Sequence, residues 1–180
     1  MWKIRTHQLS LIVWAVLFPE EVRNRLVSDQ NRQGDITNSD LELAGILLGW
    51  IVLEAIMPQI KHYQTGMLCD NTPTVAWENR LASKRSIKAG RLLQALALQQ
   101  RLAQVPPLLT MSIAREKNYM VDLASRAFCY DEYKTLTESY PFFARHLNLH
   151  SPLPQKQHWS ECHLKNDTST SVIYEMLGRR

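Results

Sequence analysis

The chain has 180 residues, of which 45% are hydrophobic, so it can build a core and is not an intrinsically disordered protein. Its formal net charge of +4 comes from 21 Lys and Arg against 17 Asp and Glu, a balance that permits nucleic-acid binding without requiring it. Its three cysteines are an odd number without a CxxC pair, which argues against a disulfide framework and favours a reducing intracellular compartment, cytoplasm or nucleus.

The first expected element is a buried strand at residues 9–18, which read LSLIVWAVLF. This apolar run is too short to span a bilayer as a helix, and no small-x-small cleavage site follows it. Its Ile, Val, Trp and Phe content suits a strand that is buried on both faces. The alternative is a secreted or membrane-targeted protein led by residues 1–18.

Two helices are expected next, separated by a polar loop at residues 28–38. Pro19, followed by two glutamates, predicts a helix start. The second helix is expected at residues 41–56, opened by a capping box of Ser39 and Glu42. Its apolar positions predict a core-facing stripe, which consists of Leu41, Ala44, Leu48, Ile51, Val52 and Ala55.

The rest of the chain continues the alternation of strands and helices, with a helix pair between two strands. This order predicts an α/β fold with a small, mostly parallel sheet. A shift in composition divides the chain into a domain at 1–130 and a C-terminal extension at 131–180. The expected elements are a strand at 65–70, a helix at 72–83 capped by Thr72, a helix from Ser86 to the stop at Pro106 with Leu92, Leu93, Leu96 and Leu102 inside, a strand at 108–113, and helices at 120–128 and 167–177.

Three carboxylates stand out because each lies where an expected strand ends or an expected helix begins: Glu42, Asp70 and Asp122. Chemistry collects at such junctions in α/β sheets. A few carboxylates suffice to bind Mg²⁺ or Mn²⁺, and two ions could clamp a phosphodiester. The simpler interpretations are a capping acid for Glu42, a turn residue for Asp70 and a helix-dipole contact for Asp122.

The sequence around each acid resembles a motif of the ribonucleases H. Residues 36–44 contain the pattern T-N-x-x-x-E-L, residues 68–72 resemble a strand that ends in aspartate, and residues 118–124 resemble N-x-x-A-D-x-L-A. The longer strings at 70–77 and 122–126 are similar to ribonuclease H-like regions that follow a reverse transcriptase in eukaryotic retroelement polyproteins. The resemblance covers about residues 11–180, including SPLPQ at 151–155 and Trp159.

This resemblance implies a ribonuclease H-like fold and cleavage of RNA in an RNA–DNA hybrid by metal ions held on Glu42, Asp70 and Asp122. The partners it implies are a hybrid or other nucleic acid and the reverse transcriptase part of a polyprotein, with no membrane. The hybrid would be held through its backbone and 2′-OH groups. Lys84, Arg85 and Lys88 are candidates for phosphate contact, with a solvated basic face as the equal alternative.

Two departures from the family make an impaired or inactive nuclease the expectation. The family carries its first catalytic aspartate on its first strand, whereas residues 9–18 contain no acid and match the family's third strand better. By this resemblance we expect an N-terminally truncated domain that lacks the family's first two strands. The family's mobile histidine has no counterpart at residues 114–117. We therefore expect residues 9–18 to pair with residues 65–70 in a three-stranded parallel sheet. The alternatives are a remnant with weak nucleic-acid binding and a nuclease completed by a partner chain or by another acid such as Asp35.

Histidines and tryptophans carry weaker signals. The tail is rich in histidine and holds Cys162, but irregular spacing and prolines disfavour a zinc site there. Tryptophans at helical positions mostly fill cores, so we expect packing roles rather than base stacking for Trp50, Trp77 and Trp159.

Overall fold

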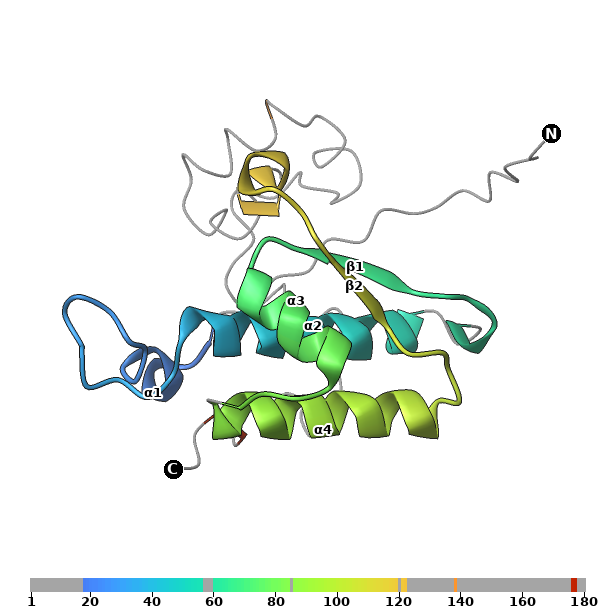
Figure 1. The fold of residues 1–180 in the computed structure, drawn as a ribbon, viewed down its shortest axis with the longest axis horizontal. Coiled ribbons are helices and arrows are strands. Elements are labelled where there is room, and N and C mark those ends of the chain that lie inside the picture. Colours follow the sequence, from blue (N-terminus) through green and yellow to red (C-terminus); the bar gives the residue numbers. More distant parts are fainter. Residues whose placement is uncertain are drawn as a thin grey trace, which may run out of the picture. The chain divides into compact units, whose positions relative to one another are not determined.

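The computed structural model describes residues 18–56, 60–84, 86–119, 121–122, 138 and 176–177. The chain forms two compact units, one of residues 1–16 with 120–162 and the other of residues 17–119 with 163–180. The helices and strands with established bounds all belong to the second unit (Figure 1). They form a mixed α/β structure, as expected from the order of elements.

The described chain begins with a single helical turn, α1 (Glu20–Arg23), which starts directly after Pro19 as predicted. The loop that follows is closed at its base, because Leu26 and Ile36 form a parallel β-bridge. Gly34 lies where the two arms meet. A Cβ atom at this glycine would stand 2.6 Å from the carbonyl oxygen of Arg25, so only glycine fits.

Helix α2 (Asn38–Ile56) begins earlier than predicted, and a different residue pair caps it. The backbone N–H of Asp40 donates to Oγ1 of Thr37 at 3.3 Å, and Oδ2 of Asp40 accepts from the backbone N–H of Thr37 at 2.8 Å. The predicted capping box of Ser39 and Glu42 was therefore wrong. Its place is taken by an equivalent reciprocal pair two residues earlier, Thr37 and Asp40.

The core lies around α2. The buried residues of this helix cover more of its circumference than the predicted core-facing stripe does. Leu43, Leu47 and Trp50 are buried although none of them belongs to that stripe, whereas Leu41 and Ile51 are only half-buried. Helices α3 and α4 both pack against α2. A helix covered in this way is apolar around most of its circumference.

Two parallel strands, β1 (Gly66–Cys69) and β2 (Leu109–Ser112), pair with Gly66 beside Leu109 and Cys69 beside Ser112. Both strands and their parallel pairing confirm the prediction. Between them run α3 (Thr72–Arg80) and α4 (Ile87–Leu102), the predicted helix pair. Short 3-10 turns lie at Ile60–His62 and Arg115–Lys117.

The caps of α3 and α4 show one correction and one confirmation. The side chain of Asn71, not that of Thr72, caps α3 by accepting from the N–H of Thr74. Ser86 caps α4 as predicted, through the N–H of Ala89. Inside α4, the leucines expected in the core are buried except for Leu102, which is 70% exposed.

Several predicted elements lie outside the described residues: the strand at 9–18, its pairing with β1, and most of the helices at 120–128 and 167–177. The two strands that are described form a two-stranded sheet. Across the described ranges, none of the helices is long and apolar enough to cross a bilayer.

Candidate metal site

Glu42 and Asp70, two of the three predicted acids, lie together in the second unit. Glu42 lies near the start of α2, and Asp70 directly follows β1. The Cys69 thiol lies with them, and one ligand atom from each of the three residues is within 4.8 Å of the others. These are the ligand types of divalent metal sites, two carboxylates and a thiol.

Hydrogen bonds between the ends of neighbouring elements place these residues. The Asn71 side chain caps α3 immediately after Asp70. The hydroxyl of Thr74, in the first turn of α3, donates to the carbonyl oxygen of Ser39 at 3.0 Å. This bond joins the start of α3 to the start of α2. Because Asp70 precedes α3 and Glu42 follows Ser39 by less than one turn, the bond holds both carboxylates at the same junction.

The electrostatics of the group favour uptake of positive charge. Although the Glu42 side chain is exposed overall, partial desolvation of its carboxylate raises the pKa of Glu42, and the nearby Asp70 carboxylate raises it further. Burial also raises the pKa of the Cys69 thiol, with a smaller contribution from the two acids, while a backbone contact with Asn71 acts in the opposite direction. A divalent cation would stabilise both carboxylates in their charged form.

Asp122, the third predicted ligand, is half-buried and belongs to the first unit. The group of ligand atoms found in the described part of the second unit consists of Glu42, Cys69 and Asp70. A role for Asp122 in the site therefore stays a prediction.

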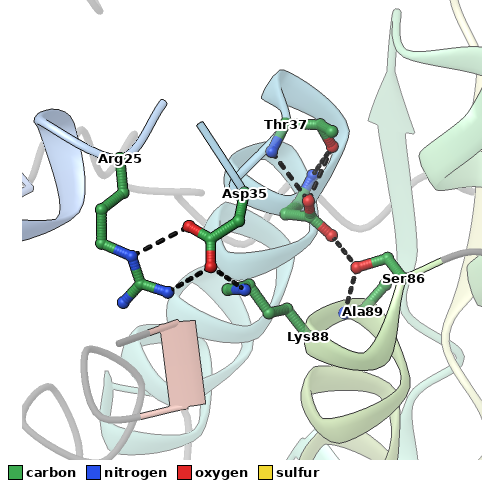
Figure 2. Close-up of polar contacts among 7 residues, drawn as sticks. Arg25, Asp35, Thr37, Ser86, Lys88 and Ala89 are labelled. Atoms are coloured by element: carbon green, nitrogen blue, oxygen red, sulfur yellow. Dashed lines mark hydrogen bonds and ion pairs between the residues drawn. The ribbon is translucent and has the colours of Figure 1, made fainter. Parts of the chain in front are cut away.

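The predicted phosphate contacts have different surroundings. Lys84 is exposed, and Arg85 lies outside the described residues. Lys88 is buried, and its Nζ donates to Oδ2 of Asp35 at 3.0 Å (Figure 2). The phosphate-contact prediction does not fit Lys88, because its ammonium group already has an acidic partner inside the protein.

Asp35, the further acid that the sequence analysis considered for the site, is also engaged by cations. Besides Lys88, it accepts from the Nε of Arg25 at 2.9 Å. The Arg25 hydrogen bond and the Lys88 contact hold the pKa of the Asp35 carboxyl well below its usual value. Its charge is thus balanced by two cations, and we find for it a structural role between the loop and α4.

A further buried acid, Glu78 on α3, was not singled out from the sequence. Its side chain is 2% exposed, and its Oε2 has no hydrogen-bond partner among the described residues. Burial raises its pKa, and the neighbouring Thr110 hydroxyl only partly offsets this effect. Helical spacing alone gives no sign of this burial, because Glu78 faces β2, which follows much later in the sequence.

Cys69 is the site residue that the sequence analysis missed. The signal was its position beside Asp70 at the end of an expected strand, but the search concerned carboxylates alone. Comparison of the chain with protein-family models, with curated proteins and with solved structures finds no match.

Proposed function

We propose that this chain is a ribonuclease H-like domain of retroelement ancestry whose Glu42 and Asp70 bind Mg²⁺ or Mn²⁺ and whose hybrid-cleaving activity is lost or strongly reduced. The observation that carries the proposal is the meeting of Glu42 with Asp70. Each comes from a separate motif of that family. The parallel pairing of β1 with β2 across a helix pair is also compatible with such a fold.

The two carboxylates of the site, Glu42 and Asp70, are suitable ligands for a hard cation such as Mg²⁺, but they are few. Mg²⁺ takes oxygen ligands and keeps several waters, so two carboxylates give a weak site. Bound metal would supply an activated water and stabilise charge on the phosphate. The protein would hold the hybrid through its backbone, with Lys84 and Arg85 as phosphate contacts.

The proposal of reduced activity rests on residues 9–18 and Asp35, neither of which supplies the family's first aspartate. Residues 9–18 carry no acid, and Asp35 is engaged by Arg25 and Lys88. Hydrolysis of a phosphodiester needs the metal ions and the attacking water in the right geometry, and loose positioning costs most of the rate. We therefore propose residual nucleic-acid binding without efficient cleavage.

The test is to measure Mn²⁺ binding by electron paramagnetic resonance, together with binding and cleavage of a labelled RNA–DNA hybrid. We expect Mn²⁺ binding that Glu42→Gln or Asp70→Asn abolishes, hybrid binding, and cleavage close to background. Glu54→Gln, on the same helix, is the matched control and should bind Mn²⁺ like the parent chain.

Two results would change the proposal. Efficient cleavage that depends on Glu42 would keep the lineage and show that another group completes the site. A folded protein that binds neither Mn²⁺ nor the hybrid would refute the proposed function.

A further inference from the structure

The Cys69 thiol gives the candidate site a donor that a magnesium site does not use. Cys69 is only 6% exposed, yet its sulfur lies within 4.8 Å of carboxylate oxygens of Glu42 and Asp70. The donor set is therefore two oxygens and one sulfur, taken from α2 and from the end of β1. Mg²⁺ prefers oxygen, whereas Zn²⁺ accepts thiolate and carboxylate in one coordination shell.

We propose that Glu42, Cys69 and Asp70 form a zinc site with three protein ligands and a water in the fourth position. Three protein ligands with one open position are typical of zinc sites that are accessible to solvent. Among first-row divalent ions, Zn²⁺ also binds a given set of N, O and S donors more tightly than Mn²⁺ does. When the ion binds, the thiol proton is released to solvent, and the thiolate sulfur donates its electron pair to the metal.

The geometry is close to what zinc needs. Zn–O bonds of about 2.1 Å and a Zn–S bond of about 2.3 Å place tetrahedral ligand atoms roughly 3.5 Å apart. The donors are within 4.8 Å of one another, so closing the site takes a movement of about 1 Å. Glu42 is exposed and can make that movement by rotating its side chain.

A second contact also prepares the sulfur to act as a ligand. The backbone N–H of Asn71 donates to Sγ of Cys69 at 3.4 Å. Such a donor stabilises negative charge on sulfur, and outer contacts of this kind orient metal ligands. The Asn71 side chain caps α3, which fixes the position of this N–H beside the sulfur.

The zinc site uses both carboxylates of the magnesium site proposed above. Zinc would therefore displace Mg²⁺ or Mn²⁺, a consequence that rests on the proposed function. Zinc binding by itself does not depend on any nuclease activity.

Cobalt(II) is the probe, because Co²⁺ takes zinc sites and its bond to a thiolate absorbs in the near ultraviolet. The full chain carrying Cys129→Ser and Cys162→Ser keeps Cys69 as its only cysteine. We expect a thiolate-to-cobalt band that grows to one equivalent and is removed by added Zn²⁺. Cys69→Ser in this background should abolish the band.

Glu42→Gln supplies a second variant at an exposed position, where folding should be unaffected. Since changes in contacts around a metal cost 10–100-fold in affinity, loss of a ligand should weaken cobalt binding at least about tenfold. Glu54→Gln should leave the affinity unchanged.

Absence of the band from the single-cysteine protein, persistence of the band after Cys69→Ser, or unchanged affinity in Glu42→Gln would each overturn the zinc site. Its failure is distinct from failure of the proposed function. Mn²⁺ and hybrid binding without a cobalt–thiolate band would refute only the zinc site. The band in a protein that binds neither Mn²⁺ nor the hybrid would refute only the proposed function.

Discussion

Asp40, which the sequence analysis did not single out as a site residue, joins the starts of two helices. It is 1% exposed, and its Oδ2 accepts from both the N–H and the hydroxyl of Thr37. Its Oδ1 accepts from the hydroxyl of Ser86, which in turn accepts from the N–H of Ala89 (Figure 2). One carboxylate thus fixes the starts of both α2 and α4.

Replacing Asp40 with alanine should therefore destabilise the fold strongly. The substitution removes a helix cap and takes away the shared acceptor of the Thr37 and Ser86 hydroxyls. We expect a loss of about 3 kcal/mol in the free energy of unfolding, measured by urea denaturation. Asp29→Ala, in the exposed loop, should change it by less than about 0.5 kcal/mol. A loss below about 1 kcal/mol for Asp40→Ala would contradict the assigned role.

Glu78 should make stability depend on pH. Its folded-state pKa is raised, so the unfolded chain loses this proton at a lower pH than the folded protein does. The contribution of Glu78 to stability is greatest below its ordinary pKa of 4.5 and falls as the pH rises from there through the folded-state pKa. Glu78→Gln should remove this fall and stabilise the protein at pH 8 by about 1 kcal/mol. If the free energies of unfolding of the two proteins changed with pH in the same way, Glu78 would not be the source of the effect.

The composition of the site was predictable only in part at the level of single residues. Glu42 and Asp70 were singled out because motifs and element junctions marked them. The partner of Lys88 was not predictable, since Asp35 lies far away in the sequence. Cys69 carried no separate signal, because a lone cysteine in a strand is usually a small apolar core residue.

Among the elements, α4 shows how far helical periodicity can be trusted. Leu92 and Leu102 were both predicted to face the core, but Leu92 is fully buried and Leu102 is 70% exposed. Leu102 is the last residue of α4, where the chain turns away into Gln104 with a positive φ of 55°. At about 100° per residue, Leu102 lies roughly 130° from the middle of the face formed by Leu92, Leu93 and Leu96, so helical spacing itself places it toward solvent.

This difference can be measured with a matched pair of substitutions. Leu92→Ala should cost about 2–5 kcal/mol, because it removes buried methyl groups and leaves a cavity. Leu102→Ala should cost less than about 0.5 kcal/mol, because its side chain is already in water. Chemical denaturation of both variants gives the comparison, and equal losses would show that the end of α4 is packed after all.

Element positions were largely predictable because local signals mark their ends. Prolines, an asparagine and a serine bracket α3 and α4, and short apolar runs mark β1 and β2. The cap of α2 was missed because two overlapping patterns compete there. Thr37 with Asp40 forms the cap in place of Ser39 with Glu42, and Asp40 also reaches Ser86, a contact that no local pattern contains.

At the scale of the whole molecule, the sequence predicted a mixed α/β class, and the second unit confirms it. The central position of α2 was not predictable, because its burial depends on α3 and α4 packing against it together. The sheet also has exposed apolar side chains, which are Leu68, Leu109 and Met111. Their exposure was not predictable, because an apolar run indicates a strand without showing which of its side chains are covered. The ribonuclease H-like fold remains part of the proposal.

The order along the chain of β1, α3, α4 and β2 also has a consequence for the path of folding. The two strands are neighbours in the sheet, but α3 and α4 lie between them in the sequence. The helices carry their own caps and can form from nearby contacts, whereas strand pairing must first meet the entropy cost of closing a long loop. We therefore expect the pairing of β1 with β2 to form late in folding. During synthesis, β1 has no partner strand until the residues of β2, which begins at Leu109, have left the ribosome.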